Sequence, residues 1–146
     1  MTLFILKVKL MGFLNRLFRK SNFKSKQFTG DNGGNALILI PANAEFEFVD
    51  YGFVSSNTSV LIQIVCRKDP YQNFRLIDDD LKKNYSVLSI KKLPKNIVIR
   101  SLPLKNGYEG DLYNERNDQA ITIRVGPESK ENLKLLLDMI RSSRFI

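Results

Sequence analysis

The sequence contains no histidine, no tryptophan and a single cysteine, Cys66. Without histidine, the chain has no Ser-His-Asp triad, no Cys-His pair and no histidine metal site. A single cysteine forms no internal disulfide, which fits a reducing compartment. We expect Cys66 to be a buried structural thiol, because no base is identifiable beside it. These absences close the commonest routes to catalysis, so we expect no enzyme activity, no cofactor and no metal.

Long apolar runs are also absent. Lys7 and Lys9 interrupt the apolar segment near residue 1, and no run approaches the roughly 20 residues that span a bilayer. No continuous apolar region is followed by a small-residue cleavage site, so we predict no cleaved signal. We expect a cytoplasmic protein, with the inner membrane surface as the alternative location.

Positive charge is in excess, but it is concentrated in one segment. The formal net charge is +8, from 23 Lys and Arg and 15 Asp and Glu. Residues 1–28 hold seven of the basic residues and none of the acidic ones. The rest of the chain is therefore close to neutral. Binding to nucleic acid requires positive charge clustered on the folded surface, so we consider that role unlikely for the domain.

Residues 1–28 are predicted to form a basic amphipathic arm. Apolar and basic side chains alternate at helical spacing, which suits an anionic membrane surface or an acidic partner. The candidate membrane-binding residues are Phe13, Leu14, Arg16, Leu17, Phe18, Arg19 and Lys20. A helix packed on its own domain and a partly disordered leader are the other interpretations. Met11 is an alternative start to Met1.

We predict a linker over residues 29–35 and a single domain over residues 36–146. The domain contains several short segments of alternating or apolar residues, separated by turn residues, which indicates antiparallel strands. A bulge or bend is predicted near Val49–Asp50, where the alternation changes parity. The predicted strands are Ala36–Ile40, residues 45–53, Val60–Cys66, Val87–Ile90, Ile97–Leu102, Tyr108–Tyr113 and Ile121–Val125.

Two helices are predicted. Asp69 and Pro70 are typical of a helix start, and apolar residues at helical spacing extend that segment to about Asn84. The second helix is predicted over Pro127–Ser142, with Pro127 as its first residue. Its apolar stripe consists of Leu133, Leu136, Leu137 and Ile140. Phe145 is expected to pack into the core. The fold class is therefore α+β, an antiparallel sheet of about six to seven strands flanked by two helices.

Two sets of acidic residues are candidates for a metal site or for catalysis. Asp78-Asp79-Asp80 lies in the first predicted helix, where consecutive side chains diverge, so we expect a solvated face rather than a metal site. The alternative of an enzyme depends on paired carboxylates. The residues concerned are Asp50, Glu109 and Asp111 with Tyr108 or Lys105.

Three short features in order resemble the PsbP-like superfamily, which includes PsbP, the Ran-binding Mog proteins and DcrB-type domains. They are the strand end Leu39-Ile40-Pro41, the glycine-marked turn Asn106–Gly110 and the ending Ser142–Phe145. The resemblance covers about residues 36–146 and departs from the pattern in lacking tryptophan. It implies a protein-binding domain rather than an enzyme, with some bacterial relatives resembling chaperones for secreted effectors.

We therefore predict a non-enzymatic, intracellular bacterial protein-binding domain of the toxin-immunity or effector-adaptor kind. The alternative is a peripheral membrane protein attached through the arm. Aromatic, Arg and charged side chains on loops are the candidate partner contacts, because Tyr and Arg are favoured at binding hot spots. These residues are Tyr51, Arg67, Tyr71, Tyr108, Glu109 and Arg116.

Overall fold

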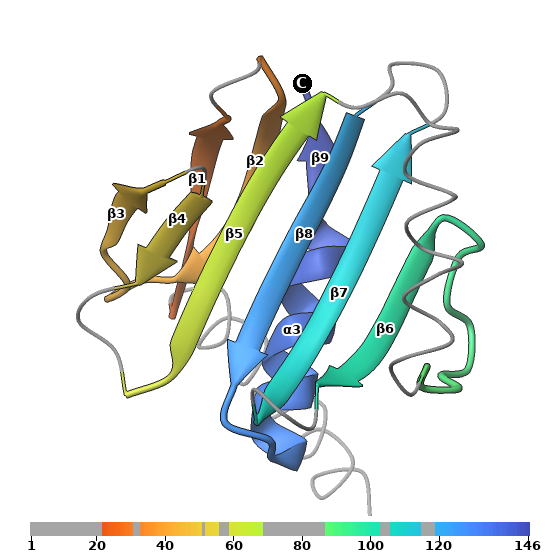
Figure 1. The fold of residues 1–146 in the computed structure, drawn as a ribbon. Coiled ribbons are helices and arrows are strands. Elements are labelled where there is room, and N and C mark those ends of the chain that lie inside the picture. Colours follow the sequence, from red (N-terminus) through yellow and green to blue (C-terminus); the bar gives the residue numbers. More distant parts are fainter. Residues whose placement is uncertain are drawn as a thin grey trace, which may run out of the picture.

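The computed structural model describes residues 22–30, 33–50, 52–55, 59–68, 87–102, 106–114 and 119–146. Within them lie two antiparallel sheets and a helix (Figure 1). The six-stranded sheet has the order β3-β4-β5-β8-β7-β6. Its strands are β3 Phe46–Val49, β4 Gly52–Ser55, β5 Leu61–Lys68, β8 Gln119–Gly126, β7 Gly107–Asn114 and β6 Ile97–Leu102. The three-stranded sheet, in the order β1-β2-β9, consists of β1 Phe23–Thr29, β2 Asn35–Pro41 and β9 Arg144–Phe145.

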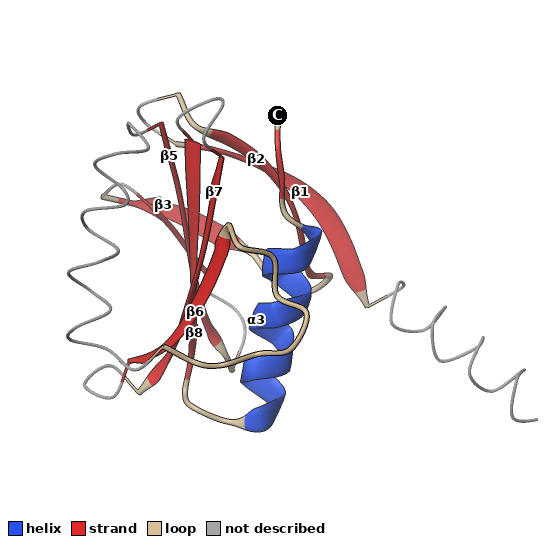
Figure 2. Ribbon diagram, turned by 90° about the vertical axis from the view of Figure 1, so that its right-hand side faces the viewer, coloured by secondary structure: helices blue, strands red, loops and turns tan. Residues whose placement is uncertain are grey.

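Helix α3, Lys130–Ser142, packs against one face of the larger sheet (Figure 2). Ile62, Ile64, Ile121 and Ile123 share this face, because alternate residues of a strand point the same way. Leu136, Met139 and Ile140 of the helix are fully buried in the same core. The predicted apolar stripe of this helix is confirmed as core-facing, with Leu133 and Leu137 partly buried at its margins.

The start of α3 differs from the prediction. Pro127 is not its first residue, since the helix begins three residues later, at Lys130. Ser129 is the N-cap, and its side chain accepts a hydrogen bond from the Asn132 N–H at 3.0 Å. A serine oxygen satisfies an N–H that has no partner within the helix, which a proline cannot do.

The small sheet corrects the predicted boundaries. Residues 23–29 form β1, although the sequence pattern placed them in the arm and the linker. The pairing of β1 with β2 explains the difference: Phe28 lies opposite Ala36, and both side chains are fully buried. Residues 1–21 of the predicted arm and the predicted helix over 70–84 lie outside the described residues.

Two further predictions concern the edges of the larger sheet. The bulge or bend predicted near Val49–Asp50 is instead a two-residue hairpin turn, which divides the strand predicted over residues 45–53 into β3 and β4, with Val49 opposite Gly52. Asp50 has a φ of 60°, the left-handed conformation that such turns require. The strand predicted over Val87–Ile90 is wrong, because only an isolated bridge joins Val87 to Arg100.

The last residues complete the small sheet. Phe145 lies opposite Ala36 and is partly buried against the core, as expected. The Ile146 N–H donates to the Asn35 carbonyl at 3.3 Å. The antiparallel arrangement with a helix on one face is confirmed, but the strands divide into two sheets rather than one. Within the described residues, no helix has both the length and the apolar character that crossing a bilayer requires.

Candidate functional site

The structure separates the residues predicted to contact a partner. Tyr51, Tyr71 and Arg116 lie outside the described residues. Arg67 lies on β5, whereas Tyr108 and Glu109 are neighbours on β7. Glu109 is within a strand rather than on a loop, and only 4% of it is exposed. It belongs instead to a group of charged side chains on the sheet.

This charged cluster comprises five residues of three adjacent strands. Arg100 comes from β6, Glu109 and Asp111 from β7, and Thr122 and Arg124 from β8. Arg100 is opposite Glu109, and Glu109 is opposite Arg124. Gly110, between the two carboxylates, faces Leu136 of α3. Because strand side chains alternate, the cluster lies on the sheet face away from that helix.

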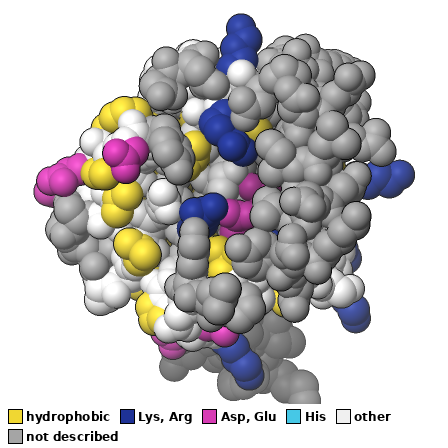
Figure 3. Space-filling model, viewed as in Figure 1, with side chains coloured by type: hydrophobic (Ala, Val, Ile, Leu, Met, Phe, Trp, Pro, Cys, Tyr) yellow, Lys and Arg dark blue, Asp and Glu magenta, His cyan; other side chains and the backbone are white. Residues whose placement is uncertain are grey.

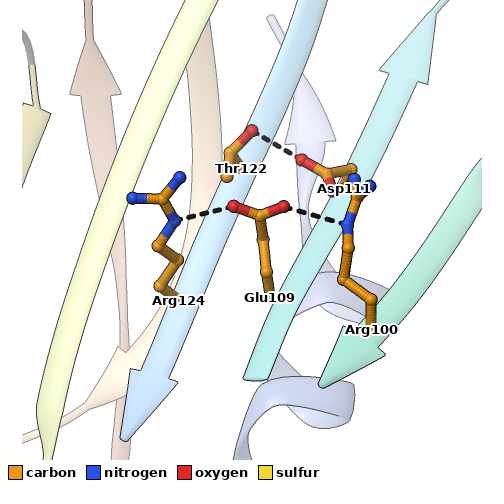
Figure 4. Close-up of polar contacts among 5 residues, drawn as sticks. All are labelled: Arg100, Glu109, Asp111, Thr122 and Arg124. Atoms are coloured by element: carbon orange, nitrogen blue, oxygen red, sulfur yellow. Dashed lines mark hydrogen bonds and ion pairs between the residues drawn. The ribbon is translucent and has the colours of Figure 1, made fainter. Parts of the chain in front are cut away.

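The ion pairs run across the strands in one row (Figure 4). The Arg124 Nε donates to Glu109 Oε1 at 2.6 Å, and the Arg100 Nε lies 3.0 Å from Glu109 Oε2. Arg100 also donates through Nη2 to Asp111 Oδ2. The Thr122 hydroxyl donates to the other Asp111 oxygen at 2.7 Å. Glu109 therefore bridges two guanidinium groups, and Arg100 bridges two carboxylates.

The row is buried at one end and accessible at the other. The side chains of Arg100, Glu109 and Asp111 are 1%, 5% and 4% exposed. That of Arg124 is 37% exposed. Burying charges is costly unless each is paired, and this arrangement gives every buried charge an opposite partner.

The pKa of the Asp111 carboxyl is unusually high for an aspartate. Desolvation by burial, and then the nearby Glu109 carboxylate, raise its pKa from 3.8 to about 7. Attraction to Arg100 and the hydrogen bonds from Arg100 and Thr122 act in the opposite direction but are smaller. Asp111 consequently exchanges its proton near neutral pH, a range in which ordinary carboxyl groups are fully ionised.

We expect this carboxyl to make the free energy of unfolding depend on pH between its unfolded and folded pKa values. Folded Asp111 keeps its proton up to about pH 7, whereas the unfolded chain loses it near pH 3.8. The native state therefore binds more protons between these values, and the free energy of unfolding falls as pH rises. Between pH 5 and 7.5 the expected fall is about 2 kcal/mol. Urea unfolding at several pH values measures it.

The absence of histidine makes this measurement specific. No unperturbed side chain titrates between pH 5 and 7.5 when histidine is missing. Asp111→Asn should unfold with nearly the same free energy across the interval, because asparagine carries no titrating proton. An unchanged slope in this variant would assign the pH dependence to another group.

The chemistry open to the cluster is limited by its pairing. Glu109 and Asp111 are adjacent on one face, but Asp50 is in the β3–β4 turn at the opposite edge of the sheet. Lys105 lies outside the described residues. The described part of the chain therefore does not bring the three carboxylates of the enzyme hypothesis together. Within the same residues, no group of three His, Cys, Asp or Glu is placed to hold a metal ion.

Sequence reasoning did not identify Arg100, Thr122 or Arg124 as members of a site. A signal existed, since Arg100 interrupts an apolar strand and Thr122 and Arg124 alternate with isoleucines. Their assembly depends on the order β6-β7-β8, which local pattern does not reveal. Cys66 is buried as predicted, and burial raises the pKa of its thiol to about 12, so it stays a neutral, unreactive thiol near pH 7.

A small cleft opens beside the exposed end of the cluster. It has a volume of about 90 Å³ and lies where β5, β8, β7 and β6 are adjacent. Leu61 and Leu102 supply its apolar side chains, and Arg124 and Gln63 its polar ones. Tyr108 and Val125 also line it, although their side chains belong to the core on the α3 face of the sheet. Gln63 is the register partner of Arg124.

A second surface feature is the edge formed by β3. Phe48 and Val49 are each 48% exposed, and Glu45, Glu47 and Asp50 beside them are exposed acids. Figure 3 shows apolar and acidic side chains interspersed on this side of the molecule. No Lys or Arg occurs anywhere in residues 27–66. The edge therefore combines exposed apolar groups with a local excess of negative charge.

Comparison with known proteins gives no match among protein families, curated proteins or solved structures. The resemblance to the PsbP-like superfamily therefore stays a prediction. The residues predicted to bind a membrane, which all precede residue 22, lie outside the described residues, and that role is likewise a prediction.

Proposed function

We propose that the chain is a non-catalytic domain that binds a partner protein, of the toxin-immunity or effector-adaptor kind. The partner supplies an extended, basic segment that adds to the outer edge of β3. The observation that carries this proposal is the exposed pair Phe48 and Val49 on an acidic edge strand.

The backbone of β3 suits such an addition. Among the described residues, β3 is at the end of its sheet and pairs with β4 alone. Val49 and Gly52 close a two-residue hairpin, so this pair exchanges hydrogen bonds across the turn. Hydrogen-bonded and non-hydrogen-bonded pairs alternate, which directs the N–H and C=O of Phe48 outward. An incoming strand would bond to these groups.

The side chains of β3 define the chemistry of the partner. Phe48 is the outer member of a series of edge-to-face rings: it contacts Phe53 at 5.1 Å, and Phe53 contacts Phe28 at the same distance. This packing holds Phe48 in place although half of it is exposed. A rigid aromatic group needs little further ordering on binding, so it is well suited as an anchor. The acids around it favour lysine or arginine on the partner.

A designed peptide tests this proposal directly. A hexapeptide alternating lysine and valine should bind, shift the amide resonances of residues 46–49, and bind more weakly as salt is added. Phe48→Ser should weaken binding about tenfold, the loss expected for a hot-spot residue. Isothermal titration and amide NMR measure both effects.

The controls separate edge pairing from simple attraction. Val87→Ser changes an equally exposed apolar residue near the other edge of the sheet and should leave the affinity unchanged. A peptide with proline at its centre should not bind, since it lacks the N–H needed for pairing. Equal binding of the proline peptide, or of Phe48→Ser, would contradict the proposal.

A further inference from the structure

The guanidinium group of Arg124 has hydrogen-bonding capacity that the charged cluster does not use. Its Nε donates to Glu109, and within the described residues no partner is found for its two terminal nitrogens. Figure 4 shows these nitrogens directed away from Glu109. Arginine binds a carboxylate through two parallel N–H groups, and the terminal edge of Arg124 offers such a pair.

Glu109 fixes this edge in position. Its carboxylate is held by Arg100 at 3.0 Å and by Arg124 at 2.6 Å, and its side chain is only 5% exposed. The Arg124 side chain is therefore anchored at Nε while its far end reaches solvent. An anchored guanidinium loses less conformational freedom on binding a ligand than a free surface arginine does.

The cleft beside Arg124 limits the size and polarity of the group attached to a carboxylate that Arg124 binds. Leu61 and Leu102 provide apolar contact on the same sheet face as Arg124, and the volume of the cleft, about 90 Å³, suits a short group. The backbone approaches closely at Gly107, where a Cβ would lie 2.7 Å from the Val125 carbonyl oxygen. A side chain at this position would therefore collide with the cleft wall.

We propose that this cleft binds a carboxylate carried on a short apolar stem, with the terminal nitrogens of Arg124 holding the carboxylate and the apolar walls holding the stem. A phosphate dianion suits the site less, because Arg124 is the one cation among the described residues that line the cleft, and Glu109 lies beside it. The ligand is either a small free acid or the terminal carboxylate of a peptide. This site is separate from the β3 edge and does not depend on the function proposed there.

Butyrate is the probe that tests the site. Added to the isotopically labelled full chain, it should shift the Arg124 Nε–H resonance and the amides of Gly107 and Gly126, with a dissociation constant on the order of millimolar. Butylammonium has the same stem and the opposite charge and should cause no such shifts. Acetate lacks the stem and should bind several-fold more weakly. Acetyl-alanyl-valine distinguishes the sources, since tighter binding than butyrate indicates a peptide end and weaker binding a free acid.

Two variants and a matched control decide the assignment. Arg124→Gln should weaken butyrate binding at least tenfold, the loss expected for a charge-assisted pair. Leu61→Ala, at a residue that is 56% exposed, should weaken it a few-fold without disturbing the charged cluster. Arg141→Gln removes an equal charge from an exposed position of α3 and should have no effect. The proposal is overturned if butyrate gives no shifts at 100-fold the expected constant, or if both cleft variants bind as the unmodified chain does.

Discussion

Replacing Arg100 by methionine is expected to lower the free energy of unfolding by about 3–5 kcal/mol at pH 7.5. Methionine fills a similar volume but leaves Glu109 and Asp111 buried without the cation that lies between them. Removing one partner of a buried ion pair costs more than the pair itself contributes, because the other charge stays out of water. Urea unfolding of the two proteins measures the loss.

The pH dependence of this loss identifies its cause. At pH 5 the Asp111 carboxyl takes up a proton, so the Arg100→Met variant should lose clearly less stability there than at pH 7.5. Arg124→Met removes the other cation of Glu109, but at a site that is 37% exposed, and should cost about 1 kcal/mol or less. An equal loss in the two variants, or a loss independent of pH, would show that Arg100 stabilises by packing alone.

Replacing Leu136 by alanine should have the second largest effect, a loss of about 2–5 kcal/mol. Leu136 is fully buried and meets the larger sheet at Gly110. A Cβ at residue 110 would lie 3.2 Å from Leu136 Cδ1 and 3.0 Å from Ile99 Cδ1. The absence of a side chain there lets α3 approach the strand closely. Thermal and urea unfolding both measure the cost of the cavity.

Gly110→Ala supplies a matched test of this contact. Alone it should cost about 1–3 kcal/mol, because the added methyl group crowds Leu136 and Ile99. Combined with Leu136→Ala, the same methyl group enters the space that the leucine vacates. The double variant should therefore lose less stability than the two single losses added together. Strict additivity would mean that helix and strand do not contact at this point.

The sequence was sufficient where a local period determines the structure. A short apolar run located the strand over residues 97–102, period-two alternation located the strand over 121–125, and helical spacing located the core face of α3. Sequence patterns failed where pairing with another segment of the chain determines the local structure. Phe23–Thr29 is polar and basic, and it becomes a strand because β2 pairs along its whole length. The helix begins after Ser129 rather than at Pro127, because the Ser129 side chain accepts a hydrogen bond from the Asn132 N–H.

The candidate site was predictable only in part, for a related reason. Glu109 and Tyr108 were identified by residue type, and both lie near the cleft or the cluster. Arg100 gave the clearer chemical signal, an arginine within Ile-Val-Ile-Arg-Ser-Leu, but its significance depends on Glu109 and Asp111 of the next strand. The exposure of the Phe48 side chain likewise follows from the position of β3 at the end of its sheet, and that position can be known only from the strand order.

The pairing of β2 with β9 has a consequence for synthesis on the ribosome. Ala36 pairs with Phe145, and the Leu39 N–H donates to the Ser142 hydroxyl, 103 residues further along the chain. Because the ribosome adds about 5–20 residues per second, β1 and β2 emerge several seconds before their last partner strand exists. During that delay the apolar face of β2, with Ile38 and Ile40, has neither α3 nor β9 against it. The nascent chain should be most vulnerable to aggregation and proteolysis in this interval, and a chaperone would be most useful there.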